Sequence, residues 1–315
     1  HHAGPSFIDG SLDLLADAVS EMGLRACLCY EVSDRDGEEK AQAGIAENIR
    51  FLEKCRDNPS PYLKGLFGLH ASFTVGPDTL KQCVSEAKRL DAGFHVHTAE
   101  DAADQDQCLS VYGQRVVERF AAEGVLKPGT ILAHCIHIDG NERSLIKENG
   151  AFAVHNPESN MGNAVGRADA LGMVAEGITM GMGTDGFTSD MFQELKVFNV
   201  LHKLGERDPR VGYGELMPIL FDNNRKILSS FFDKPLAVIK PGAYADLIVL
   251  DYCPPTPFET GTFLGHLLFG LKGGMVRTVM IGGNIIMEDR CIAGIDEDAI
   301  AEKSRTRSRE LWKRF

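Results

Sequence analysis

Short apolar segments alternate with longer amphipathic ones along the chain, and this alternation restricts the fold more than any other feature. Segments typical of strands occupy 25–32, 63–70, 93–100, 130–136, 151–156 and 178–185. Segments with helical spacing occupy 38–57, 77–91, 106–124, 140–149 and a region near 190–205. Strands that alternate with helices indicate parallel βαβ units, and nearly all-apolar strands are typical of a sheet covered on both faces. The sequence therefore predicts the α/β class, as a barrel or as an open doubly wound sheet.

The pattern changes at about residue 236. Residues 236–252 and 273–290 are β-branched and punctuated by glycine, with no helix inside them, so they predict strands of a small antiparallel unit. Residues 295–315 are charged and amphipathic, which predicts a terminal helix.

Charge and composition argue against several kinds of partner. The net charge is -12, and an acidic surface repels phosphate backbones, so we expect no nucleic-acid partner. The sequence contains no run of about 18 apolar residues, so we expect no membrane span. The first ten residues lack the basic and apolar regions of a signal peptide. The eight cysteines are scattered without metal-knuckle spacing, as expected of reduced thiols in a cytoplasmic protein.

Polar residues gather where the predicted strands end, which is where functional side chains cluster in parallel α/β folds. They are His70, His95, His97, Glu100, His134, His155 and Asp185. One such histidine alone is more often a packing residue. A whole series of them favours a shared metal or catalytic site, because each buried polar group left unpaired costs about 1–3 kcal/mol.

Individual residues suggest individual roles. His95 and His97 are two apart, so both point to one side of a strand. Imidazole binds Zn²⁺ or Fe²⁺ well, and a nearby glutamate such as Glu100 can transfer protons. His155 and Asn156 either line the pocket or belong to a simple turn. His137 is interpreted as a packing residue and not as a ligand.

Four ordered motifs then resemble one family. HVHTAE, LAHCIHI, VHNPESNMGNAVG and MGTDG, followed by KPGAYADLIVLD, look like the amidohydrolase superfamily, in its deaminase and chlorohydrolase branch. HHAGPSFIDGSLD and RACLCYEVSDRDG further resemble an aminohydrolase group associated with bacterial selenium metabolism.

The resemblance implies a (β/α)8 TIM-like barrel with one divalent metal, zinc before iron. It implies that His97 and Asp185 are metal ligands, and that Glu100, His134 and Asp185 are catalytic. It also implies that His70, His155 and Asn156 bind substrate. Within the chain, it implies a barrel over 1–235, the C-terminal half of a β-sandwich over 236–292 and a terminal helix over 293–315.

One departure stands out. The family has an HxH pair on its first barrel strand, and no such pair precedes His70. His1 and His2 are adjacent, so they would point opposite ways, and we place them near the end of the second strand. The resemblance thus predicts that strand one, most of strand two and half of the sandwich lie outside this chain. The metal would then be absent from this shorter chain, and mass spectrometry of the purified protein tests the idea.

The function expected from these features is deamination of a small heterocycle such as a purine or pyrimidine. Chloride release from a triazine, or opening of a cyclic amide, is the alternative within enzymes. A non-catalytic barrel acting as a binding or scaffold protein is the alternative of another class. A homodimer is compatible with each of these.

Overall fold

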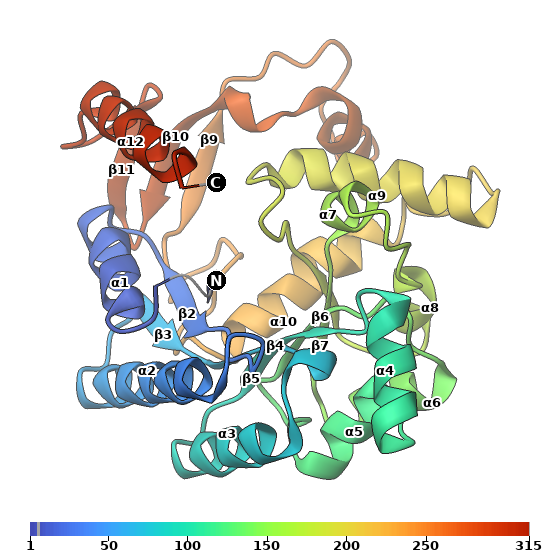
Figure 1. The fold of residues 1–315 in the computed structure, drawn as a ribbon. Helices are drawn as coiled ribbons and strands as arrows, with labels where there is room; N and C mark the ends of the chain where they lie inside the picture. The colour runs from blue at the N-terminus through green and yellow to red at the C-terminus, as the bar shows by residue number, and fades with distance from the viewer. Residues whose placement is uncertain (5–6, 315) are drawn as a thin grey trace.

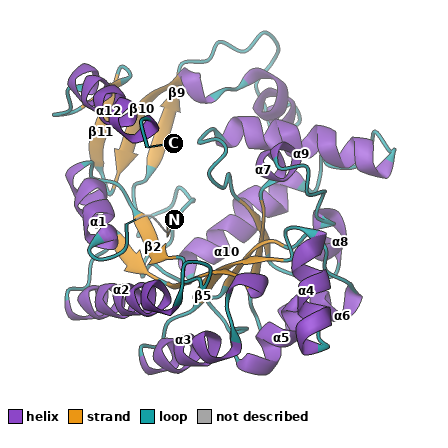
Figure 2. Cartoon of the chain, in the orientation of Figure 1, coloured by secondary structure: helices purple, strands orange, loops and turns teal. Residues whose placement is uncertain are grey.

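The computed structural model describes residues 1–4 and 7–314 and shows a curved parallel sheet with helices around its outside (Figure 1). In chain order the parallel strands are β1 (His2–Ala3), β2 (Ala26–Tyr30), β3 (Leu63–Gly65), β4 (Phe67–Ala71), β5 (Phe94–Thr98), β6 (Ile131–His134), β7 (Phe152–His155) and β8 (Met180–Met182). The predicted α/β class with a parallel sheet is confirmed (Figure 2).

The predicted strand 63–70 is split at Leu66 into β3 and β4. Both halves nevertheless lie alongside β2 and the residues that come after it. Beyond the break, the Val32 N–H donates to the Gly68 carbonyl oxygen at 3.2 Å. The Asn48 amide, from the helix behind, accepts from the Tyr30 N–H at 2.9 Å and donates to the Tyr30 carbonyl at 2.8 Å. The strands therefore form one series in chain order, which is the order of a barrel and not of a doubly wound sheet.

Helices connect successive strands and cover the outer face of the sheet (Figure 1). They are α1 (Ser11–Glu21), α2 (Glu38–Asp57), α3 (Pro77–Arg89), α4 (Ala102–Tyr112), α5 (Val116–Glu123), α6 (Gly140–Glu148), α7 (Pro157–Gly162), α8 (Ala170–Ala175), α9 (Met191–Glu206) and α10 (Asn224–Ser229). The single helix predicted over 106–124 was wrong. Gly113 takes φ 66°, a left-handed conformation that ends α4, and α5 begins three residues later.

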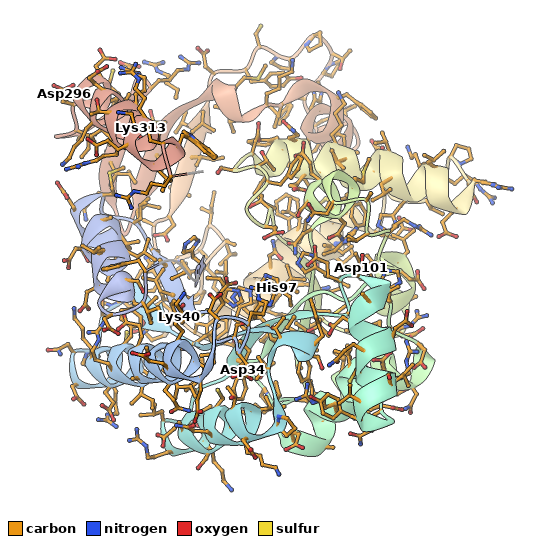
Figure 3. The ribbon with its side chains drawn as sticks, viewed as in Figure 1. Asp34, Lys40, His97, Asp101, Asp296 and Lys313 are labelled. Atoms are coloured by element: carbon orange, nitrogen blue, oxygen red, sulfur yellow. The ribbon has the colours of Figure 1, made fainter. Side chains whose placement is uncertain are left out.

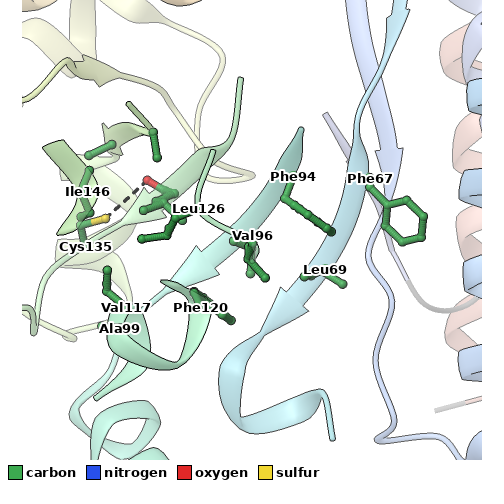
Figure 4. Packing of buried hydrophobic residues seen from close by; sticks show 14 of the residues in the cluster. Phe67, Leu69, Phe94, Val96, Ala99, Val117, Phe120, Leu126, Cys135 and Ile146 are labelled. Carbon is green, nitrogen blue, oxygen red and sulfur yellow. Dashed lines mark hydrogen bonds between the residues drawn. The ribbon is translucent and has the colours of Figure 1, made fainter. Parts of the chain in front are cut away.

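The core lies between the sheet and these helices (Figure 4). Side chains alternate along β5, so Phe94 and Val96 face the helices and are at most 1% exposed. Phe120 of α5 belongs to the same apolar cluster. His95 and His97 therefore point to the opposite, inner side of the curved sheet.

The C-terminal part forms a separate antiparallel sheet in the order β12-β11-β10-β9. Its strands are β9 (Leu247–Leu250), β10 (Val276–Ile281), β11 (Asn284–Glu288) and β12 (Cys291–Ile292). The short helix α11 (Phe263–Gly265) lies between β9 and β10 in the chain, and α12 (Glu297–Trp312) follows β12. The antiparallel unit and the terminal helix are as predicted, although the strand expected over 236–252 is confined to β9.

Arg25, just before β2, joins the two sheets. Its guanidinium forms an ion pair with Asp246 at 2.8 Å and lies 4.0 Å from the ring centroid of Tyr244. Both partners precede β9 in the chain, so the small sheet is held directly to the start of a barrel strand. Among the described residues, no helix is both long and apolar enough to span a membrane.

Candidate metal and catalytic site

A cavity of about 830 Å³ opens on the inner side of the sheet, at the carboxyl ends of its strands. Its lining includes His2, Glu31, His97, His134 and Asp185. Figure 3 labels His97 of β5, which lies near the middle of the view. The cavity therefore lies at the strand ends, where functional side chains are expected in parallel α/β folds.

Three of the predicted residues, His97, His134 and Asp185, line this cavity, and a fourth, Glu100, lies beside them. One donor atom from each of His97, His134 and Asp185 lies within 4.8 Å of the others. The Nε2 atom of His134 is 3.6 Å from Glu100 Oε2 and 4.0 Å from Asp185 Oδ2. Strands β5, β6 and β8 supply these side chains from their carboxyl ends, where parallel strands converge.

Hydrogen bonds fix which ring nitrogens face the cavity. His97 Nδ1 lies 2.7 Å from the His70 carbonyl oxygen, which can only accept, so Nδ1 holds the proton and Nε2 keeps its lone pair. His134 Nδ1 lies 2.7 Å from Asn160 Oδ1 in the same way. This arrangement, one nitrogen anchored and one free, is typical of histidines that bind metal.

The site fits a cation. His134 Nε2 is buried and has no hydrogen-bond partner among the described residues. A buried polar atom left unpaired costs about 1–3 kcal/mol, and a cation with its bound water would satisfy it. Two imidazoles and a carboxylate are donors that suit zinc and iron.

Asp185 is held in its ionised form. Burial alone would raise its pKa, but the Ser159 hydroxyl, donating at 2.6 Å, and the Gly186 N–H keep the pKa of Asp185 below its usual value. The nearby His134 and His97 act in the same direction. A carboxylate that is ionised at neutral pH can bind a cation or accept a proton.

Three residues at this site have a strained backbone. Ala99, His134 and Asp185 have φ values of 47°, 71° and 53°, in the left-handed region that side chains with a Cβ rarely adopt. They follow or end β5, β6 and β8 respectively. Such conformations cost about 1–3 kcal/mol each and cluster at functional sites.

The remaining predicted residues lie outside the cluster of His97, His134 and Asp185. Asn156 borders the cavity, and its Nδ2 is 3.5 Å from His134 Nδ1. The His70 ring centroid is 5.3 Å from that of His97, and burial, with His97 beside it, lowers the pKa of His70 to about 3. His155 is fully buried and lies outside the cavity lining, with its Nε2 3.3 Å from His202 Nε2 of α9.

Sequence reasoning missed two cavity residues. The ring of His2 in β1 contacts those of His95 and His97, with centroids 3.9 and 5.0 Å away. Glu31 follows β2, shares a donor cluster with His2 and His97, and has a pKa raised by burial. Glu31 ends an apolar strand, so the rule that selected Asp185 would also have selected it. His137, in contrast, is not among the described residues that line the cavity, and its Nε2 pairs with the Val165 carbonyl oxygen at 2.9 Å.

Comparison with known proteins gives a consistent result. Residues 3–286 match the model of the amidohydrolase family. A 5-methylthioadenosine/S-adenosylhomocysteine deaminase of Pelotomaculum thermopropionicum is 31% identical over 310 residues, covering 96% of this chain and 70% of that protein. A 5'-deoxyadenosine deaminase of Methanosarcina acetivorans is 30% identical over 305 residues, covering 95% of this chain and 70% of that protein.

Solved structures share the fold. An adenosine deaminase from Xanthomonas campestris with bound zinc superimposes with a TM-score of 0.83 at 24% identity, covering 98% of this chain and 71% of that one. An atrazine chlorohydrolase from Arthrobacter aurescens, complexed with zinc, gives 0.77 at 17% identity, covering 97% and 71%. These likenesses agree with the barrel architecture predicted from the order of the motifs.

Proposed function

Because the chain belongs to the amidohydrolase family, we propose that it is a metal-dependent hydrolase that removes ammonia from an amino-substituted, purine-like heterocycle. The convergence of His97, His134 and Asp185, with Glu100 beside them, is the observation on which the proposal rests. The names of the relatives from Pelotomaculum and Methanosarcina support the reaction and the class of substrate.

We assign His97 and Asp185 as the protein ligands of one divalent cation, zinc before iron. When bound, such a cation supplies Lewis acidity that lowers the pKa of water to about 7. His134, anchored through Asn160, directs its free Nε2 at the same point and would orient the attacking water. Asp185 would accept the proton that this water loses.

Glu100 would complete the proton transfers. Its carboxylate lies 3.6 Å from His134 Nε2 and is partly exposed, so a substrate ring bound beside His134 would come within its reach. A proton carried on Glu100 would pass to a ring nitrogen while the water oxygen forms its bond to the ring carbon, and the new hydroxyl would return a proton to Glu100 as the carbon–nitrogen bond to the amino group breaks. The amino group then leaves as ammonia with the proton that Asp185 took from the water.

The cavity volume supports a substrate larger than a single ring. About 830 Å³ lies in the upper part of the range typical of small-molecule sites, about 300–1,000 Å³. We therefore propose a purine nucleoside without phosphate as the first class to test, since the cavity borders carry the acidic groups Glu31 and Asp185. His70 and Asn156 are proposed substrate contacts, whereas the position of His155 behind the cavity favours a packing role.

The experiment is an assay of the metal-loaded chain against adenosine, 5'-deoxyadenosine, guanine and a chlorinated triazine. We expect ammonia release from at least one amino-substituted ring, measured with an enzymatic ammonia assay. Chloride release from the triazine without any ammonia release would favour the chlorohydrolase alternative. Metal binding without turnover of any of these compounds would favour the binding-protein alternative.

The finer assignments stay proposals. The donor set favours zinc, and the free state of all eight cysteines is compatible with a reducing cytoplasm. A homodimer, the likeness to selenium-associated aminohydrolases and the domain limits at residues 235 and 292 are proposed in the same way.

A further inference from the structure

A second cluster of metal-binding side chains lies deeper on the cavity wall. Donor atoms of His2, Cys29 and His95 all lie within 4.8 Å of one another. They come from β1, β2 and β5, and none of them belongs to the cluster of His97, His134 and Asp185. We propose that these three residues bind a second, thiophilic metal ion.

The separation of the donor atoms fits such an ion. The Sγ atom of Cys29 lies 3.7 Å from His95 Nδ1. Zinc–sulfur and zinc–nitrogen bonds of about 2.3 and 2.1 Å at a tetrahedral angle place the two ligands about 3.6 Å apart. The observed pair therefore needs little movement to share one tetrahedral ion.

A hydrogen bond orients the third proposed ligand, His2. His2 Nε2 lies 2.9 Å from the His95 carbonyl oxygen, so Nε2 donates and Nδ1 keeps its lone pair. The ring of His2 also lies against that of His95, with centroids 3.9 Å apart. This hydrogen bond orients an imidazole in the manner of partners that orient metal-bound histidines.

Chemistry and access favour a soft ion. Cys29 is 1% exposed, whereas His2 and His95 line the cavity, so the ion would enter from the cavity with the thiolate behind it. A thiolate with two imidazoles favours zinc, cadmium or copper(I) over magnesium or calcium. Three protein donors leave the fourth position for a cavity water.

The test is a cobalt(II) titration of the chelator-treated chain under reducing, oxygen-free conditions. A thiolate bound to cobalt gives a strong near-ultraviolet charge-transfer band, which an imidazole–carboxylate site lacks. We expect this band to saturate at one equivalent in the wild-type chain, with a second equivalent bound without it. X-ray absorption of the zinc-loaded chain should show one sulfur at about 2.3 Å.

Variants separate the two sites. Cys29→Ser should lose the band and one equivalent of metal, whereas Cys27→Ser, which alters the thiol two residues earlier on the same strand, should keep both. Asp185→Asn should keep the band and lose the other equivalent, so failure of the proposed catalytic site would be seen separately. Circular dichroism checks that each variant is folded, and His95→Gln, which retains the thiol, should weaken cobalt binding at least tenfold.

Three results would overturn the proposal. They are the lack of a band in the wild-type chain, an unchanged band in Cys29→Ser, or loss of the band in Cys27→Ser. An unchanged band in Cys29→Ser would mean that cobalt binds an exposed thiol such as Cys253 or Cys291.

Discussion

His97 Nδ1 donates a 2.7 Å hydrogen bond to the main-chain carbonyl oxygen of His70. Strand β4 thus sets the orientation of an imidazole on β5 through its backbone, so the side chain at position 70 can change without removing the acceptor. The free Nε2 of His97 is therefore presented to the cavity by the fold itself, and the predictions below start from this arrangement.

His97→Asn should abolish binding of the metal at the catalytic site, because it removes an anchored ligand from a small donor set. Calorimetric titration with zinc, or competition against a coloured chelator, measures the loss. His137→Asn is the matched control, since His137 pairs with the Val165 carbonyl away from the cavity. Equal zinc affinity in His97→Asn and the wild-type chain would disprove the ligand assignment.

Glu100→Gln should lower kcat by about 10²–10⁴-fold while the metal content stays unchanged, because the amide cannot transfer a proton. Steady-state ammonia release and elemental analysis of the same sample give the two numbers. Glu123→Gln, at the end of α5, serves as control. The role fails if Glu100→Gln turns over substrate at the wild-type rate.

Ser159→Ala should raise the pKa of Asp185, since it removes the hydroxyl that donates to the carboxylate at 2.6 Å. Protons compete with metal for this carboxylate, so the pH at which the chain releases metal on acidification should move upward by about one unit. Metal release followed against pH measures the shift. Ser144→Ala, on the surface of α6, should leave the curve in place; a curve unmoved in Ser159→Ala would contradict the expectation.

The burial of Glu194 leads us to expect a free energy of unfolding that depends on pH. Burial raises its pKa from 4.5 to about 7, so the folded chain holds a proton that the unfolded chain has lost. The stabilising effect of this proton is complete below pH 4.5 and is lost as the pH rises to about 7. This titration changes the free energy of unfolding by at most about 3 kcal/mol, because one pKa unit corresponds to about 1.36 kcal/mol.

Glu194→Gln removes this titration. Urea unfolding of metal-free protein at pH 5 and pH 8 should show a smaller loss of unfolding free energy in the variant than in the wild-type chain. Glu148→Gln at the end of α6 controls for the change of net charge. Identical losses in Glu194→Gln and the wild-type chain would exclude Glu194 as the cause.

The α/β class followed from periodicity, because apolar runs alternate with helix-forming segments, whereas the choice of a barrel over an open sheet came from the family resemblance. His97, Glu100, His134 and Asp185 could be selected because each lies at or just beyond the end of a strand, and parallel strands bring their ends together. The contact of His2 with His95 could not be predicted, since 93 residues separate them and only the curvature of the sheet makes them neighbours.

The sequence also could not predict in which direction a single side chain at a strand end points. His155 ends β7 as His134 ends β6, yet His155 points to His202 of α9 and His134 to the cavity. The difference depends on local backbone conformation, since His134 takes φ 71°, which residue type alone does not reveal. The break between α4 and α5 at Gly113 arises in the same way from one left-handed residue.

The ion pair between Arg25 and Asp246 affects how the molecule comes apart. Arg25 precedes β2, whose far end reaches Glu31 in the cavity wall, so the strand is held by the small sheet at one end and borders the cavity at the other. Separating the small sheet would strip the guanidinium of its carboxylate and of the Tyr244 ring. We therefore expect the amides of the C-terminal sheet and of β2 to exchange in one cooperative opening, so that opening of the small sheet also loosens the cavity wall at Glu31.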